Sequence, residues 1–283
     1  MHPSPPYGDG GEWYDDQPRQ WWRKARKLLG FPASRDVGIL SRLLGPLREQ
    51  VEERLGRKVG SAVVTSSNIV AVYAEDITDA MEYTGLKPPY LKGSFDFSQP
   101  REVSAAQAGY GIGLCPHYKD YDQCEREEGQ MPVRRFLTVL FTRSALLLYK
   151  AASKEALEFY EPRQFGRSDF LLGSDAIHNN PKEEYYWEDV RNRVMEVLLQ
   201  YGGERHPVTQ VFVLGESALN PRFLEVVNSS ISAIYEEQPE FLLSDPMFAA
   251  ARGAAEFAIR APWSLPTHWA NMANVDQAGG ADL

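Results

Sequence analysis

Residues 208–221 combine a strand pattern, a turn and a helix start, and the turn has side chains that could do chemistry. The β-branched apolar run 208–214 predicts a buried strand, and Gly215 directly after it predicts a tight turn. Asn220 followed by Pro221 predicts an N-cap and a first helical position. Because the N-terminus of a helix favours an anion, this turn could hold a phosphate through Gly215 and Ser217.

Ser217 also allows a second chemistry, which is nucleophilic catalysis. The run 215–219 approximates the Gly-x-Ser-x-Gly elbow of α/β-hydrolases, and Asp245 and His268 follow in the order Ser, Asp, His. Leu219 stands where that motif has its final glycine, and no oxyanion-hole motif precedes the strand. A serine hydrolase that uses Ser217 is therefore an alternative hypothesis.

Cys115, His117 and Cys124 are three potential metal ligands in one polar segment. A structural zinc site needs four donors, usually with cysteines separated by two to four residues, and this segment has no obvious fourth donor. The two cysteines could instead form a disulfide, but a cytosolic chain argues against that bond. We therefore predict no metal site and expect reduced thiols.

The elements around these residues follow from hydrophobic periodicity. Residues 37–55 predict a helix despite Pro46, and residues 183–202 and 222–235 predict two more helices. Two apolar strands are expected at 136–141 and 145–149. A further helix is expected after Ser244-Asp245-Pro246, with small residues suited to close packing against a sheet or ligand. These small residues are Ala249, Ala250, Ala251, Gly253, Ala254 and Ala255.

Three stretches resemble the actin, hexokinase and heat-shock-seventy chaperone superfamily. Residues 211–223 and 245–255 resemble its adenosine segment, in which a Gly-Gly-x-Ser-x-x-Pro turn precedes a helix and a later Asp-Pro…Gly-Ala-Ala helix closes the site. Residues 44–86 resemble a chaperone stretch in which a strand, expected at 59–65, lies between two helices. Residues 105–114 are similar to the Ala-Ala-x-x-x-Tyr-Gly connecting helix.

The resemblance is nearest to the heat-shock-seventy-like proteins of filamentous fungi, and it implies a fold and a ligand. The implied fold is α/β, an incomplete actin-like ATPase (ribonuclease H-like) fold with mixed sheets flanked by helices and a truncated N-terminal edge. We expect residues 44–65 and 208–258 to lie in one compact body. The implied cofactor is ATP or ADP, bound by Gly215, Glu216, Ser217 and Gly253.

The phosphate chemistry of that superfamily is missing here. Its members hold phosphates and magnesium with two Asp-x-Gly hairpins, and the first hairpin has no counterpart before Arg35. At the second, Leu140 and Leu147 replace the aspartates. Glu216 would repel a phosphate. We therefore expect a degenerate, noncatalytic protein-interaction or regulatory module, with residual ATP or ADP binding without turnover as an alternative.

Composition and charge limit the partners. A net charge of −9 gives no electrostatic reason to bind nucleic acid, and no long apolar run or leader predicts a membrane partner. A cytoplasmic protein is therefore expected.

The predicted domains are a disordered tail with a short basic helix at 1–34, a truncated ATPase domain at 35–261 and a flexible tail at 262–283. An unknown protein could dock on Trp21 and Trp22, or these side chains could pack on their own domain while the adjacent bases are solvated.

Overall fold

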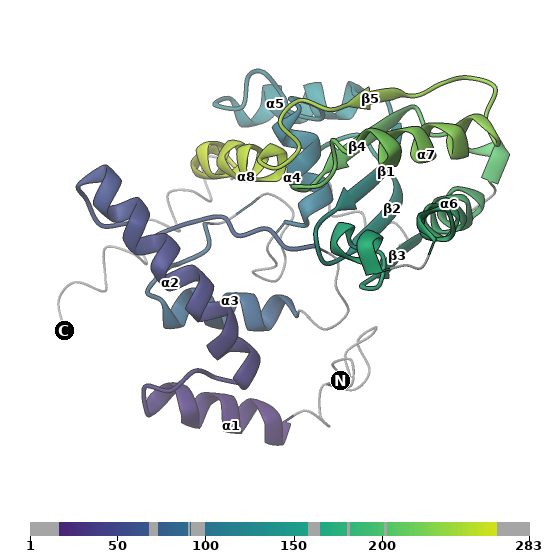
Figure 1. Ribbon diagram of the computed structural model, residues 1–283. Helices are drawn as coiled ribbons and strands as arrows, with labels where there is room; N and C mark the ends of the chain where they lie inside the picture. The colour runs from purple at the N-terminus through teal and green to yellow at the C-terminus, as the bar shows by residue number, and fades with distance from the viewer. Residues whose placement is uncertain are drawn as a thin grey trace. The chain divides into compact units, whose positions relative to one another are not determined.

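The computed structural model describes residues 17–67, 73–89, 91, 100–157, 165–179, 182–200 and 203–264. The chain divides into two compact units, Met1–Glu102 and Val103–Leu283 (Figure 1). We call them the N-terminal and C-terminal units. Residues 44–65 and 208–258, expected in one body, fall in different units. The tails expected to be disordered or flexible lie outside the described residues, apart from residues 17–34 and 262–264.

The described part of the N-terminal unit contains three helices. They are α1 (Gln17–Leu28), α2 (Arg35–Leu55) and α3 (Ala74–Tyr83). The Ser34 hydroxyl caps α2 by accepting the amide of Val37, and Gly56 ends it with a φ of 64°. Pro46 lies inside α2 without ending it. The expected helix at 37–55 is therefore confirmed.

Charged side chains join α1 to α3. The guanidinium of Arg23, which is 4% exposed, lies 2.8 Å from Asp76 and also pairs with Asp79 and Glu75. Lys27 pairs with Asp79 at 3.0 Å. The bases of α1 are thus not simply solvated, because they neutralise an acidic face of α3.

Trp21 and Trp22 are 73% and 64% exposed, so the expectation that they pack back on their own domain is wrong. On α2, Leu40 and Leu44 pack against buried residues of this unit, whereas most of the remaining apolar stripe stays exposed. The exposed apolar side chains of α2 are Ile39, Leu43, Leu47, Val51 and Leu55.

Residues 59–65 do not form the expected strand. The segment makes only an isolated bridge between Ser61 and Lys87. Its apolar side chains Val59, Ala62 and Val64 pack on the cluster formed by Ile77, Met81 and Leu86. Apolar burial explains the sequence pattern, but a strand also needs a neighbour that satisfies its backbone groups over several residues.

The C-terminal unit contains a mixed five-stranded sheet in the order β3-β2-β1-β4-β5. The strands are β1 (Arg134–Phe141), β2 (Leu146–Ser153), β3 (Phe165–Asp169), β4 (Gln210–Leu214) and β5 (Glu240–Leu242). The β1–β2 and β2–β3 pairs are antiparallel, and β1–β4 and β4–β5 are parallel. These strands confirm the expected α/β class and the predicted hairpin at 136–149.

Helices cover the sheet (Figure 1). On one face, α6 (Glu183–Leu199) and α7 (Pro221–Ser232) share a core with alternate residues of the strands, including Val139 and Val213. The intervening residue Phe212 belongs to the opposite face, since side chains alternate along a strand, and it stacks on Tyr110 at 5.7 Å. Tyr110 follows α4 (Glu102–Gly109). The remaining helices are α5 (Tyr121–Gln130), α8 (Ala249–Arg260) and the 3-10 turns η1 (Ser174–Asn179), η2 (Gly203–Arg205) and η3 (Ala261–Trp263).

Two glycines allow α4 and α8 to touch through their backbones. A Cβ added to Gly253 would lie 1.6 Å from the carbonyl oxygen of Ala105, and one added to Gly109 would lie 1.9 Å from that of Ala249. Ala249 and Gly253 therefore serve a helix–helix crossing, not the sheet or ligand contact that we expected, while Ala251 and Ala255 are exposed.

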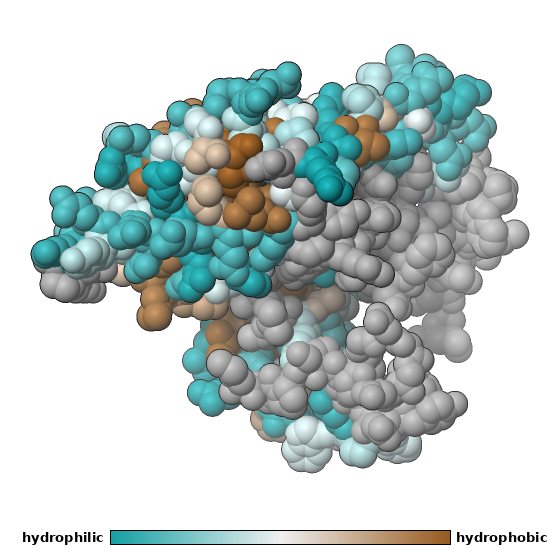
Figure 2. All heavy atoms as spheres, turned by 90° about the vertical axis from the view of Figure 1, so that its right-hand side faces the viewer, coloured by the Kyte–Doolittle hydropathy of each residue, from teal (hydrophilic) through white to brown (hydrophobic). Residues whose placement is uncertain are grey.

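None of the helices described between Gln17 and Ser264 combines the length and the apolar composition of a bilayer-spanning segment. At the surface, brown apolar patches lie among mostly teal side chains in the view of Figure 2. Phe170 and Leu171, at the end of β3, are among the exposed large apolar residues.

Replacing Arg23 with alanine should destabilise the N-terminal unit by about 3–5 kcal/mol, because it leaves the buried Asp76 without its cation. Hydrogen exchange should show faster exchange of the α1 amides. Lys24→Ala is the matched control, since Lys24 is an exposed base on the same helix. Equal protection of α1 in both variants would disprove this role for Arg23.

Tyr110 should make the C-terminal unit less stable in strong alkali. Its hydroxyl donates to the carbonyls of Val213 and Leu242, and burial raises its pKa from 10.0 to about 12. This stabilisation is complete below about pH 10 and is lost as the pH rises through about 12.

Tyr110→Phe should cost about 1 kcal/mol at pH 9 and should lose less stability than the wild type between pH 10 and 12. Urea unfolding at each pH measures this difference. Tyr235, whose pKa is also raised to about 12, contributes equally to both proteins. Parallel pH profiles for the two proteins would refute the assignment.

Candidate functional site

The turn after β4 is held against the end of β1. Gly215 has a φ of 102°, and a Cβ there would lie 2.3 Å from the carbonyl oxygen of Phe141, so the position requires glycine. The amide of Ser217 donates to that same carbonyl at 3.2 Å. Asn220 then caps α7 by accepting the amides of Arg222 and Phe223. The predicted strand, turn and helix are confirmed.

Glu216 reaches across to the tip of the β1–β2 hairpin. Its carboxylate accepts a hydrogen bond of 2.8 Å from the backbone amide of Arg143. The guanidinium of Arg143 forms a bidentate pair with Asp175, at 3.1 and 3.0 Å, and these hydrogen bonds raise the pKa of Arg143. The amide and the side chain of Arg143 are both engaged by carboxylates of the chain itself.

The turn η1 is the third segment at this place. The amide of Ser174 donates to the carbonyl of Thr142, and the amide of Asp175 donates to that of Arg143. The hydroxyls of Ser174 and Ser217 are 2.8 Å apart. Hairpin tip, glycine turn and η1 therefore meet at one edge of the sheet.

A hollow of about 400 Å³ lies between η1 and the glycine turn. We call it the edge hollow, and the side chains that define its chemistry are those of Ser174, Asp175, His178, Glu216, Ser217 and Asn220. Its volume is at the lower end of the range for small-molecule sites. Two carboxylates line it, which opposes an anionic ligand by about 1–4 kcal/mol for each charge pair about 4 Å apart.

The edge hollow brings together three of the four residues expected at a nucleotide site. Glu216 and Ser217 line it, and Gly215 forms the turn behind them. Gly253 does not line the hollow, because it is packed in the crossing of α8 with α4.

The hydrolase constellation is not assembled by the residues that the structure describes. Asp245 pairs with the guanidinium of Arg252 at 2.6 Å, and Ser217 has the hydroxyl of Ser174 as its hydrogen-bond partner. His268 lies outside the described residues. His178 lines the edge hollow, although no sequence pattern connected it with Ser217.

Sequence reasoning missed the contribution of η1. Ser174, Asp175 and His178 belong to no motif, and Asp175 is recognisable only once it lies beside Arg143. A possible signal was the glycine before the turn. A Cβ on Gly173 would lie 2.3 Å from the carbonyl of Arg143, so this glycine marks a close backbone approach.

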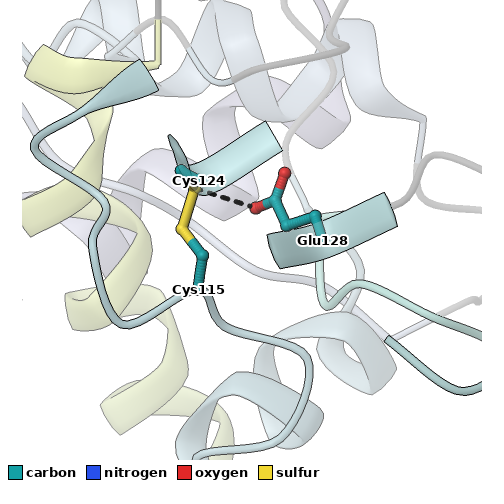
Figure 3. Close-up of side chains that lie close together, drawn as sticks. All are labelled: Cys115, Cys124 and Glu128. Carbon is teal, nitrogen blue, oxygen red and sulfur yellow. Dashed lines mark hydrogen bonds between the residues drawn. A yellow bond between two sulfur atoms is a disulfide. The ribbon is translucent and has the colours of Figure 1, made fainter. Parts of the chain in front are cut away.

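The expectation of reduced thiols is wrong for this structure. Cys115 and Cys124 form a disulfide, and the carboxylate of Glu128 lies 3.4 Å from the sulfur of Cys124 (Figure 3). The Cα atoms are 5.3 Å apart, within the normal range for a disulfide. His117 is not part of this group, since its Nδ1 is 2.5 Å from Glu127.

Ser217→Ala should cost about 1 kcal/mol of stability through loss of the hydrogen bond to Ser174. Ser174→Ala should cost a similar amount, and the double mutant should cost less than the sum because both changes remove one interaction. Denaturant unfolding measures all three variants.

We also expect no labelling by a fluorophosphonate probe. Labelling that Ser217→Ala abolishes would instead establish a nucleophile.

Comparison with known proteins gives no family assignment. No protein-family model matches the chain. No curated protein matches it either. The function proposed below therefore rests on the sequence resemblance and on the geometry of the site.

Proposed function

We propose that the C-terminal unit is an incomplete actin-like ATPase (ribonuclease H-like) domain without phosphate chemistry. The protein is then a degenerate heat-shock-seventy-like chain that acts as a noncatalytic protein-interaction or regulatory module. The adjacency of the β1–β2 hairpin and the Gly215 turn supports this proposal, because the resemblance requires a phosphate hairpin and an adenosine turn at one site.

The hydrogen bond from the Arg143 amide to Glu216 is the observation that carries the proposal. In a phosphate-binding hairpin, free backbone amides at the tip receive the phosphate oxygens. Here a carboxylate of the chain already accepts the amide of Arg143. Glu216 thus satisfies the donor and adds a negative charge where a phosphate would bind, so the edge hollow is closed to nucleotides.

The hairpin also lacks metal ligands at the expected positions. Leu140 and Leu147 are direct partners across β1 and β2, and both are buried. An apolar pair of this kind stabilises the sheet but cannot coordinate magnesium, which requires oxygen ligands. Phosphoryl transfer depends mostly on metal ions and preorganised donors. We therefore infer that this unit does not turn over ATP.

Residual nucleotide binding is the second candidate within this proposal. Gly215 and Ser217 keep the small turn in front of α7, and the edge hollow has space beside them. However, the Ser217 hydroxyl pairs with Ser174, and Gly253 is covered by α4. These contacts favour a structural turn over an adenosine site.

The interaction role is supported by the surface of the N-terminal unit. Trp21 and Trp22 are exposed on α1. The next residue, Arg23, is buried and forms an ion pair with Asp76 of α3. Aromatic residues are enriched at protein interfaces. A protein partner could therefore contact the two tryptophans without disturbing the ion pairs that hold α1.

A cytoplasmic location is part of the same proposal. Thiols are kept reduced in that compartment, and disulfides that form there are usually transient or redox-sensing. The Cys115–Cys124 bond would then open and close with the redox state of the cell.

Neither the wild-type protein nor Glu216→Gly should bind ADP, because the Ser217 hydroxyl stays paired with Ser174 and Gly253 stays covered by α4 in both. Calorimetry with ADP and magnesium measures this. ATP turnover should stay undetectable in both proteins, since Leu140 and Leu147 remain. Glu237→Gly is the matched control, an exposed glutamate in a loop of the same unit.

Two outcomes would contradict the proposal. Wild-type binding of ADP that Ser217→Ala removes would establish the residual nucleotide site. ADP heat from Glu216→Gly but not from the wild type would mean that the Gly215 turn is an adenosine site that Glu216 alone closes.

A further inference from the structure

Outside the edge hollow, two sulfur atoms and one carboxylate gather between α5 and the loop that precedes it (Figure 3). The sulfurs of Cys115 and Cys124 and a carboxylate oxygen of Glu128 all lie within 4.8 Å of one another. We call these three residues the thiol–carboxylate cluster. In the oxidised protein its sulfurs form the disulfide.

The backbone fixes these three donors from two directions. Cys124 and Glu128 are four residues apart on α5 and thus share one helix face. Asp120 caps this helix by accepting the amide of Gln123 at 3.0 Å. Cys115 lies in the loop after α4, and its carbonyl accepts a hydrogen bond of 2.7 Å from the guanidinium of Arg260. Both anchors are independent of the sulfur–sulfur bond.

The carboxylate of Glu128 is buried together with the sulfur of Cys115. Cys115 is 2% exposed and Glu128 is 7% exposed. The adjacent Glu127 behaves differently, because it points to His117 at the surface. Helix α5 therefore turns one of its two consecutive glutamates toward the sulfurs.

We propose that reduction of the Cys115–Cys124 disulfide converts the thiol–carboxylate cluster into a binding site for a thiophilic divalent cation such as Zn²⁺. The ligands are the two sulfurs and one carboxylate oxygen of Glu128. Thiolates and carboxylates are both ordinary zinc ligands, and a fourth position remains for water. The site is independent of the edge hollow and of the function proposed above.

The chemistry balances with a dithiol reductant. Its two thiols give two electrons and two protons, the bond between the sulfurs of Cys115 and Cys124 breaks, and the reductant becomes a disulfide. Zinc then binds as both cysteine thiols release their protons to water. Because the same sulfurs form either the disulfide or the metal bonds, the two states exclude each other.

The distances suit a tetrahedral ion. Zinc bonds of about 2.3 Å to sulfur and about 2.1 Å to oxygen place a sulfur and an oxygen ligand about 3.6 Å apart. The sulfur of Cys124 and the oxygen of Glu128 are 3.4 Å apart. Two sulfur ligands need about 3.8 Å between them, a separation that side-chain rotation can supply once the disulfide has opened.

Zinc binding to the full-length chain tests the proposal. The protein is reduced with a phosphine, which does not bind zinc as thiols do, and competes with a chromophoric chelator for the metal. The reduced protein should take up one Zn²⁺ per chain, and the oxidised protein should take up none. With Co²⁺ in place of zinc, the reduced protein should show the absorption of cobalt–thiolate bonds.

Glu128→Gln removes the carboxylate and keeps both cysteines, so it should weaken zinc binding by at least about tenfold, as even loss of outer-sphere partners does. Glu127→Gln is the matched control and should leave the affinity unchanged, because Glu127 faces His117. Cys124→Ser should abolish the cobalt–thiolate absorption. Circular dichroism of each variant checks that the chain is folded.

Three results would overturn the proposal. They are equal zinc uptake by the reduced and oxidised proteins, equal affinities of Glu128→Gln and the wild type, and absence of zinc uptake by a reduced protein that is folded. None of these results depends on nucleotide binding, so the zinc site and the proposed function can fail separately.

Discussion

Parallel pairing of β1 with β4 is the constraint on which the C-terminal unit depends. Parallel strands end at the same edge of a sheet, so the segment after β1 and the segment after β4 must meet. They meet so closely that Gly215 has no space for a Cβ beside the carbonyl of Phe141. A helical layer covers the sheet formed around this pair, because α6 and α7 pack on the face that includes Val139 and Val213. The α4–α8 pair is held by its own glycine contacts.

The same edge explains why carboxylates surround this glycine turn at the start of a helix. Crowding at the strand ends brings Glu216 to the amide of Arg143 and brings Asp175 to its guanidinium. Each carboxylate accepts hydrogen bonds from a donor group of Arg143 that would otherwise face solvent or a ligand. A site built to bind a phosphate leaves its donors free, whereas this edge has used them within the chain.

The N-terminal unit is stabilised by a different interaction. A short basic helix is held on α3 by ion pairs around one buried guanidinium, while the apolar cluster of Ala33, Val37 and Ala80 joins α2 and the segment before it to α3. Pairs of this kind require both partners, because a lone buried charge is costly. Charge complementarity therefore positions α1 and leaves its tryptophans at the surface. The helix uses its polar face for folding and keeps its aromatic face available.

The sequence by itself determined the elements whose signals are local. The apolar runs of β1, β2 and β4, the cap at Asn220 and the stripe of α6 are read from neighbouring residues, and so is the apolar character of Leu140 and Leu147. Only the tertiary structure decided which distant segments meet. Residues 59–65 carry a strand pattern but pair with no strand in the part of the chain that the structure describes, and Gly253 touches a helix instead of a ligand. Glu128 joins the two cysteines because α5 faces that loop. Local periodicity specifies which face of a segment is apolar, whereas its partner is chosen by packing between segments far apart in the chain.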